Sequence, residues 1–139
     1  MTPDTLAQIH AAAFTTDRSW SAQEFQTLQN SPHTHVTATP AGFALWRSVA
    51  GEAELLTIAV HPTHQNKGLG RQLMSRWMAQ AASSADTALL EVAADNSAAR
   101  KLYVHFGFQI VAIRKNYYSR PSGKADAVLM RAPLPFSVP

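Results

Sequence analysis

Residues Leu55–Met78 read LLTIAVHPTHQNKGLGRQLMSRWM, and the rest of the chain is organised around this stretch. It begins with an apolar strand, Leu55–Val60, that ends at His61-Pro62 because proline cannot donate a hydrogen bond to a sheet ladder. After a polar loop, Gly68 opens a helix. Its apolar side chains recur with the 3.6-residue period, namely Leu69, Leu73, Met74, Trp77, Met78 and Ala81. A strand, a glycine-bearing loop and a helix N-terminus therefore follow one another directly.

The junction between this loop and the helix is a predicted phosphate site. A helix N-terminus presents unpaired backbone N–H groups and the positive end of the helix dipole at one point, where phosphates bind readily. Gly68 and Gly70 lack a Cβ, so the backbone can approach such a ligand closely. The pattern is neither a P-loop, since no Gly-Lys-Ser/Thr follows, nor a dinucleotide G-x-G-x-x-G motif. The alternative interpretation is an ordinary glycine turn that starts a helix.

Length and composition favour one globular enzyme domain. A chain of 139 residues with 46% hydrophobic and 15% charged residues can bury a single core and is not typical of disorder. No apolar run reaches the roughly 20 residues needed to span a bilayer, and no signal peptide is visible. The chain has no cysteine, which excludes disulfides and thiolate catalysis. We therefore expect a cytoplasmic protein that does not bind membranes.

The first half of the chain predicts two helices followed by a hairpin. The helical period places one helix over residues 3–14, and the capping box Ser21-x-x-Glu24 starts a second one. Trp20 precedes the box, where a hydrophobic staple would place it. β-prone runs over residues 34–39 and 43–49 flank a Pro-Ala-Gly turn. Paired histidines lack a nearby third ligand, so we expect no metal site at His33, His35, His61 or His64.

The second half predicts strands over residues 87–92, 109–114 and 125–131. Between the first two, Asp95-Asn96-Ser97 offers N-cap choices for a helix that Gly107 ends. Residues 116–121 are predicted to form a polar and aromatic loop, and the proline-rich tail over residues 133–139 is expected to fray. This order predicts an α+β domain with a largely antiparallel sheet. Glu91 shares a strand face with Leu89, so its carboxylate either reaches water at the strand end or is held there for a purpose.

Several segments resemble one enzyme family. Residues 65–70 are similar to the Q/R-x-x-G-x-G/A pyrophosphate loop of the GNAT superfamily of acetyl-CoA-dependent N-acetyltransferases. The second half resembles RimI-type GNAT enzymes, which acetylate the N-terminal alanine of a small-subunit ribosomal protein. The matching segments are Leu90-Glu91-Val92-x-x-Asp95-Asn96-x-Ala98-Ala99, Leu102-Tyr103, Gly107-Phe108, Arg114-x-Asn116-Tyr117-Tyr118 and Gly123-x-x-Asp126-Ala127. The resemblance implies a GNAT fold, a mixed, mostly antiparallel sheet flanked by about four helices. It also implies one N-acetyltransferase domain over residues 1–132, followed by a C-terminal tail.

The resemblance implies acetyl-CoA as co-substrate and assigns residues to it. The strand backbone would hold the acetyl group and pantetheine arm, with the amide of Val60 polarising the thioester carbonyl. Asn96 would hydrogen-bond the arm, although a pure N-cap is the alternative. The implied cofactor-binding residues are Ile58, Ala59, Val60, Gln65, Asn66, Lys67, Gly68, Leu69, Gly70, Arg71 and Asn96. Glu91 matches the family's proton acceptor and Tyr103 its proton donor, whereas a tyrosine that only packs in the core is the alternative. In the family, the segment containing Trp20 also lines the acceptor groove.

The implied chemistry is reasonable on its own. A protein α-amino group has a pKa of about 7.7–8.0, so a carboxylate such as Glu91 can take its proton, directly or through water. A strand amide that is free of its ladder can stabilise the oxyanion, and a phenol such as Tyr103 can protonate the leaving thiolate. No covalent enzyme intermediate is needed, which agrees with the absence of cysteine.

The acceptor is the least defined part of this prediction. Ala93 stands where RimI-type enzymes usually have a basic residue, so a cation beside the acceptor groove is lost. We expect a protein N-terminus as acceptor, with a ribosomal protein as first candidate. The alternatives are a GNAT enzyme that acetylates a small amine and a non-catalytic CoA-binding module. A monomer or weak dimer is expected, without direct nucleic-acid binding, because no basic stripe with interleaved aromatic residues is present.

Overall fold

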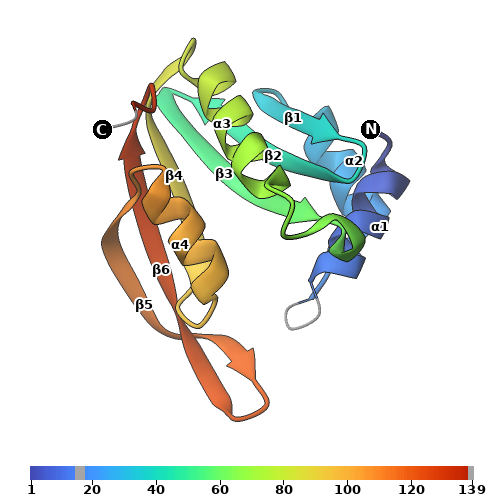
Figure 1. Ribbon diagram of the computed structural model, residues 1–139, viewed down its shortest axis with the longest axis vertical. Coiled ribbons are helices and arrows are strands. Elements are labelled where there is room, and N and C mark those ends of the chain that lie inside the picture. The colour runs from blue at the N-terminus through green and yellow to red at the C-terminus, as the bar shows by residue number, and fades with distance from the viewer. Residues whose placement is uncertain (15–17, 138–139) are drawn as a thin grey trace.

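The computed structural model describes residues 1–14 and 18–137, which form a six-stranded mixed sheet with helices on both faces (Figure 1). The strand order is β1-β2-β3-β4-β6-β5, and pairing is parallel between β3 and β4 and antiparallel elsewhere. No helix of the described chain is long and apolar enough to cross a membrane. The predicted α+β architecture is confirmed. The elements are α1 (Pro3–Ala13), α2 (Ala22–Asn30), β1 (Thr34–Thr39), β2 (Gly42–Val49), β3 (Gly51–Val60), a 3-10 turn (Pro62–His64), α3 (Leu69–Ala81), β4 (Ala85–Ala93), α4 (Ser97–His105), β5 (Gln109–Arg120) and β6 (Gly123–Pro133).

Side-chain caps begin three of the four α-helices in the described chain. The Thr2 hydroxyl caps α1, Ser21 and Glu24 form the reciprocal capping box of α2, and Asn96 caps α4. Each such cap contributes about 0.5–2 kcal/mol of stability. Helix α3 differs, because Gly68 occupies its N-cap position with a φ of 82° and no side chain caps its first turn. The predicted helix starts are confirmed, and the uncapped one lies at the glycine loop.

The sheet buries a separate apolar cluster on each face. Alternate β2 side chains point to opposite faces, so Phe43 packs with α1 and α2 whereas Trp46 packs with α3. The rings of Phe25 and Phe43 meet edge to face at 5.6 Å. On the other face, Trp77 is fully buried and donates its indole N–H to the Met74 sulfur at 3.2 Å. Anything bound between two strands of this sheet therefore meets α1 and α2 on one side and α3 and α4 on the other.

Strands β3 and β4 are paired over their first halves only. The last paired residues are Glu54 and Leu89, whereas β3 stays paired with β2 up to Val60 and β4 with β6 up to Ala93. The second halves of β3 and β4 therefore diverge, as Figure 1 shows. Beyond this point the backbone N–H and C=O groups of β3 form no hydrogen bonds with those of β4. These groups can therefore bond to a ligand that lies between the two strands.

A β-bulge lies at the start of the divergence. The consecutive β2 residues Leu45 and Trp46 pair with Thr57 and Leu55, so Leu56 is an extra residue in β3. Because side chains alternate along a strand, one extra residue exchanges the faces of all the residues that follow it. The sequence pattern did not predict this bulge.

Strand β5 continues to Arg120, so the predicted strand end at Arg114 and the predicted loop over residues 116–121 are wrong. The three β5 residues between Arg114 and Tyr118 oppose the single β6 residue Asp126. The Asp126 carboxylate accepts a backbone N–H of this bulge at 2.9 Å and forms a 3.2 Å ion pair with its lysine. The segment is polar because it forms a bulge within a strand, whereas the sequence analysis interpreted its polar residues as a loop.

The C-terminal segment is more ordered than predicted. Strand β6 runs to Pro133, and the next residue, Leu134, is buried. The Leu134 N–H donates to the carbonyl of Asp86 at 2.9 Å. Phe136 also packs against the core. The prediction of a frayed tail is therefore wrong for these residues, because their apolar side chains bury against the sheet, and residues 138–139 lie outside the described chain.

Candidate active site

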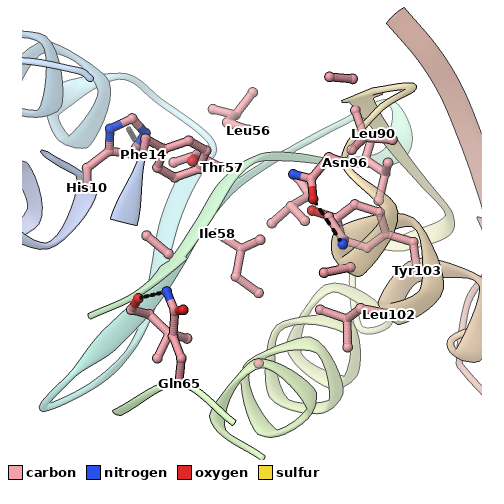
Figure 2. Close-up of a pocket in the computed structure, with 18 of the residues that line it drawn as sticks. His10, Phe14, Leu56, Thr57, Ile58, Gln65, Leu90, Asn96, Leu102 and Tyr103 are labelled. Carbon is pink, nitrogen blue, oxygen red and sulfur yellow. Dashed lines mark hydrogen bonds between the residues drawn. The ribbon is translucent and has the colours of Figure 1, made fainter. Parts of the chain in front are cut away.

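A cavity of about 570 Å³ lies between the diverging halves of β3 and β4. Residues 55–60 of β3 and 90–93 of β4 form its walls. Helix α1 contributes His10 from one face of the sheet, and helix α4 contributes Tyr103 from the other. Figure 2 shows these two side chains on opposite sides of the cavity, with Ile58 between them. The cavity therefore spans the sheet.

The N-terminus of α3 forms one end of the cavity, through Gly68, Leu69 and Gly70. Since no side chain caps this helix, its first N–H groups are available to a ligand. A Cβ on Gly70 would lie 3.6 Å from the Leu102 Cδ2 atom, which is an ordinary contact, so packing does not require glycine there. An anionic group can approach this helix end closely.

The loop before α3 is tied back to the end of β3. The Gln65 side chain donates to the backbone carbonyl of Val60 at 2.9 Å (Figure 2). Asn66 adopts a positive φ of 62°, which asparagine tolerates better than most residues. All the predicted cofactor residues line the cavity except Lys67 and Arg71, which are exposed and lie outside its lining.

The Glu91 carboxylate is held at the cavity wall by two β5 side chains. The Tyr118 hydroxyl donates to Oε1 at 3.1 Å, and an Arg114 guanidinium nitrogen lies 3.8 Å from Oε2. The Glu91 side chain is 28% exposed. The side chain therefore reaches solvent in part, as one interpretation expected, and is also held by specific partners. A carboxylate with these two partners still has acceptor capacity for a further proton donor.

The Tyr103 ring packs in the core and also lines the cavity. It is 6% exposed and meets the Phe108 ring at 6.0 Å. Burial raises the pKa of the Tyr103 phenol above its ordinary value, so the hydroxyl keeps its proton near pH 7. Asn96 accepts the Ala99 N–H at 3.2 Å as the cap of α4 and lines the same cavity. The packing role of Tyr103 and the capping role of Asn96 are thus present, and both residues line the cavity, where their roles toward acetyl-CoA stay predictions.

Helix α1 contributes a histidine that the pattern analysis missed. His10 is 2% exposed, and its Nδ1 accepts the backbone N–H of Trp20 at 3.1 Å. Its ring stacks on Phe14 at 4.2 Å and on Trp20 at 5.2 Å. Burial lowers the pKa of His10 to about 4, so the ring is neutral near pH 7. Leu6 and Ile9 precede it on the buried helix face, and a histidine in this apolar stripe was the available signal.

A staple and an ion pair fix the start of α2 beside this histidine. The Trp20 and Phe25 rings lie 5.6 Å apart, which confirms the predicted hydrophobic staple, and Trp20 also lines the cavity. The Arg18 guanidinium binds both Glu24 carboxylate oxygens, at 2.7 and 3.0 Å. This pairing lowers the pKa of Glu24 to about 2. The wall contributed by α1 and α2 is therefore tied together by local contacts.

A second cavity of about 390 Å³ shares residues of β3 with the first. It adds Asp95 and Arg120, which form a two-pronged ion pair at 2.8 and 3.0 Å. Across the described residues, no three His, Cys, Asp or Glu side chains converge in a way that could hold a metal ion. The charges of Asp95 and Arg120 thus neutralise each other at this cavity.

Comparison with known proteins agrees with this geometry. Residues 4–108 match the acetyltransferase (GNAT) family. The ribosomal protein bS18-alanine N-acetyltransferase of Escherichia coli is 37% identical over 120 residues, which cover 83% of this chain and 81% of the relative. The N-alpha-acetyltransferase RimI of Mycobacterium tuberculosis is 38% identical over 134 residues, or 90% and 82% of the two chains. The crystal structure of the Escherichia coli enzyme superposes with a TM-score of 0.86 at 32% identity, over 97% of this chain and 89% of that chain.

Proposed function

Because the chain belongs to the acetyltransferase (GNAT) family, we propose that its cavity transfers the acetyl group of acetyl-CoA to the N-terminal α-amine of a protein. By name, one sequence relative is an N-alpha-acetyltransferase and the other is an N-acetyltransferase for an alanine of ribosomal protein bS18. A ribosomal protein with an N-terminal alanine is therefore our first candidate acceptor. The observation that carries the proposal is the cavity that spans the sheet between β3 and β4, since it offers one side to each substrate.

Acetyl-CoA fits the side of the cavity formed by α3 and α4. The uncapped N–H groups at Gly68–Gly70 would bind its pyrophosphate, and no Cβ at Gly70 blocks the approach. The pantetheine arm would lie along Ile58–Val60, where the β3 edge has no strand partner, with Asn96 within the same lining. When bound, acetyl-CoA supplies the activated acyl group.

Glu91 and Tyr103 would move the protons of this transfer. As the amine nitrogen bonds to the acyl carbon and the carbon–sulfur bond breaks, Glu91 takes the amine proton, directly or through water. Tyr103 gives its hydroxyl proton to the departing thiolate, and its raised pKa means that it carries that proton beforehand. The free amine is neutral often enough near pH 7.5, because its pKa is about 7.7–8.0.

The charges around the cavity favour a peptide over a polyamine. A strongly cationic acceptor would need unpaired carboxylates near the site. Glu91 is instead paired with Arg114, and Asp95 with Arg120. The wall on the α1 side carries the rings of His10, Phe14 and Trp20 together with the cation Arg18. A small-molecule amine is the alternative acceptor that an assay must exclude.

Kinetics with a peptide that begins with alanine test the assignment. We expect Glu91→Gln and Tyr103→Phe each to lower kcat by about 100-fold with little change in the KM for acetyl-CoA, since general acid–base catalysis contributes about 10²–10⁴. Wild-type turnover by both variants would refute the roles given to these residues. A panel of small amines, together with mass spectrometry of ribosomal proteins treated with the enzyme, tests the acceptor. Preference for an amine over every peptide would refute the proposed substrate class.

A further inference from the structure

His10 carries a polar atom inside the cavity that the acid–base chemistry does not use. Its Nδ1 accepts the Trp20 N–H, so the proton of the neutral ring resides on Nε2. None of the hydrogen bonds formed by the described residues engages this Nε2–H, and its residue is 2% exposed while lining the cavity. Nε2 is not among the described buried side-chain atoms that lack a partner, so this edge of the ring is accessible from the cavity. A donor that is held in place at a cavity wall can bond to an acceptor atom of a bound ligand.

The ring that carries this donor is rigidly held. Phe14 stacks on it at 4.2 Å, Trp20 at 5.2 Å, and Phe25 meets it edge to face at 5.5 Å. The hydrogen bond from the Trp20 N–H to Nδ1 further restricts rotation of the ring. Figure 2 places the ring beside Phe14 on the side of the cavity opposite Tyr103. A bound partner would therefore meet a donor whose position is already set, which reduces the ordering cost of binding.

We propose that His10 is an acceptor-binding residue, whose Nε2–H donates a hydrogen bond to the carbonyl oxygen of the acceptor's first residue. This inference rests on the proposed function and deepens it, because it names the peptide carbonyl next to the α-amine as the recognised group. That oxygen is separated from the reacting nitrogen by the Cα and carbonyl carbons only. The inference therefore requires His10 and Glu91 to contact the same first residue of the acceptor, and both residues line the same cavity. An amine without this carbonyl forfeits the hydrogen bond.

The lowered pKa of His10 supports this role. Burial keeps the ring neutral above about pH 4, although Glu24 acts in the opposite direction and Arg18 adds to the lowering. A neutral ring keeps Nδ1 as an acceptor for Trp20 and Nε2–H as a donor at every pH at which the amine is nucleophilic. His10 is consequently a fixed donor and not a proton acceptor in the reaction.

Two altered acceptors test the inference on the wild-type enzyme. One is the alanine peptide with its first peptide bond replaced by a trans-alkene, which removes the carbonyl oxygen. The other is the matching ester, which keeps that oxygen and removes only the following N–H. We expect kcat/KM to fall about tenfold for the alkene relative to the ester, as loss of one hydrogen bond to a buried donor predicts.

Two variants complete the test. His10→Asn can still accept the Trp20 N–H through Oδ1 but has no donor at the Nε2 position, whereas His10→Gln places an amide N–H near that position. We expect the preference for the ester over the alkene to disappear in His10→Asn and to be partly kept in His10→Gln, with the KM for acetyl-CoA unchanged in both. Equal use of ester and alkene by the wild-type enzyme overturns the inference alone. Failure to acetylate the parent peptide at all overturns the proposed function with it.

Discussion

Replacing Gly70 with alanine should weaken acetyl-CoA binding without weakening the fold. Gly70 is the second residue of α3, and a Cβ there would lie 3.6 Å from a Leu102 methyl group, with no closer atom. Its φ is not positive, so alanine adopts the same backbone conformation without strain. Alanine stabilises a helix over glycine by about 0.5–1 kcal/mol. In a domain of this size that raises the unfolding midpoint by about 2–4 °C.

The Gly70→Ala substitution should instead weaken binding of the pyrophosphate of acetyl-CoA. A methyl group at position 70 would occupy the space through which a phosphate reaches the first N–H groups of α3. Each hydrogen bond to a charged group is worth about 1.5–3 kcal/mol, so losing one weakens binding by about 10- to 100-fold. Isothermal titration with CoA measures this change directly, and thermal unfolding of the free protein measures the stability.

Gly68→Ala is the matched control, because it should change stability in the opposite direction. Gly68 has a φ of 82°, and no atom lies within 4 Å of a Cβ built there. Its glycine is required by backbone conformation and not by space, so alanine should cost about 1–2 kcal/mol. If Gly70→Ala instead binds CoA with the wild-type Kd, the helix N-terminus is not the pyrophosphate site and the reasoning fails. A lowered unfolding midpoint for Gly70→Ala would refute the packing argument.

Two further predictions follow from the side chains around the cavity. Tyr118→Phe removes the hydrogen bond that orients Glu91 and should lower kcat by about 2- to 10-fold at unchanged KM for acetyl-CoA, whereas an unchanged kcat would mean that this contact is not used. Because His10 has a pKa of about 4 when folded and 6.5 when unfolded, the unfolded chain takes up the proton first, and stability should fall from about pH 6.5 to pH 4 by at most about 3 kcal/mol. Below about pH 4.5 the lowered pKa of Glu24 adds to this loss. Urea unfolding of wild type and His10→Phe should show the steeper pH dependence in wild type, and parallel curves would contradict the assignment.

The elements that the sequence predicted are those governed by neighbouring residues. The box of Ser21 and Glu24, the cap at Asn96 and the glycine at position 68 each act within one helical turn, so a short window contains their cause. The strand, loop and helix around residues 65–70 were predicted for the same reason. Glu91 and Tyr103 were singled out by resemblance, and both line the cavity.

Contacts between distant segments decided the rest. The bulge at Leu56 depends on the register between β2 and β3, and the one opposite Asp126 depends on pairing between β5 and β6. The hydrogen bond from Tyr118 to Glu91 joins residues 27 positions apart. Such pairings are set by which side chains pack across the sheet, and no local pattern encodes them.

The sequence alone therefore determined where a phosphate-binding helix start would stand and which residue types could move protons. Only the tertiary structure decided that β3 and β4 separate after Glu54, that the resulting cavity reaches both faces of the sheet, and that His10 lines it. The physical reason is that the opening forms because β3 stays paired with β2 and β4 stays paired with β6 beyond the point where β3 and β4 separate. The β4–β6 pairing joins residues far apart in the chain, so no short stretch of sequence encodes it.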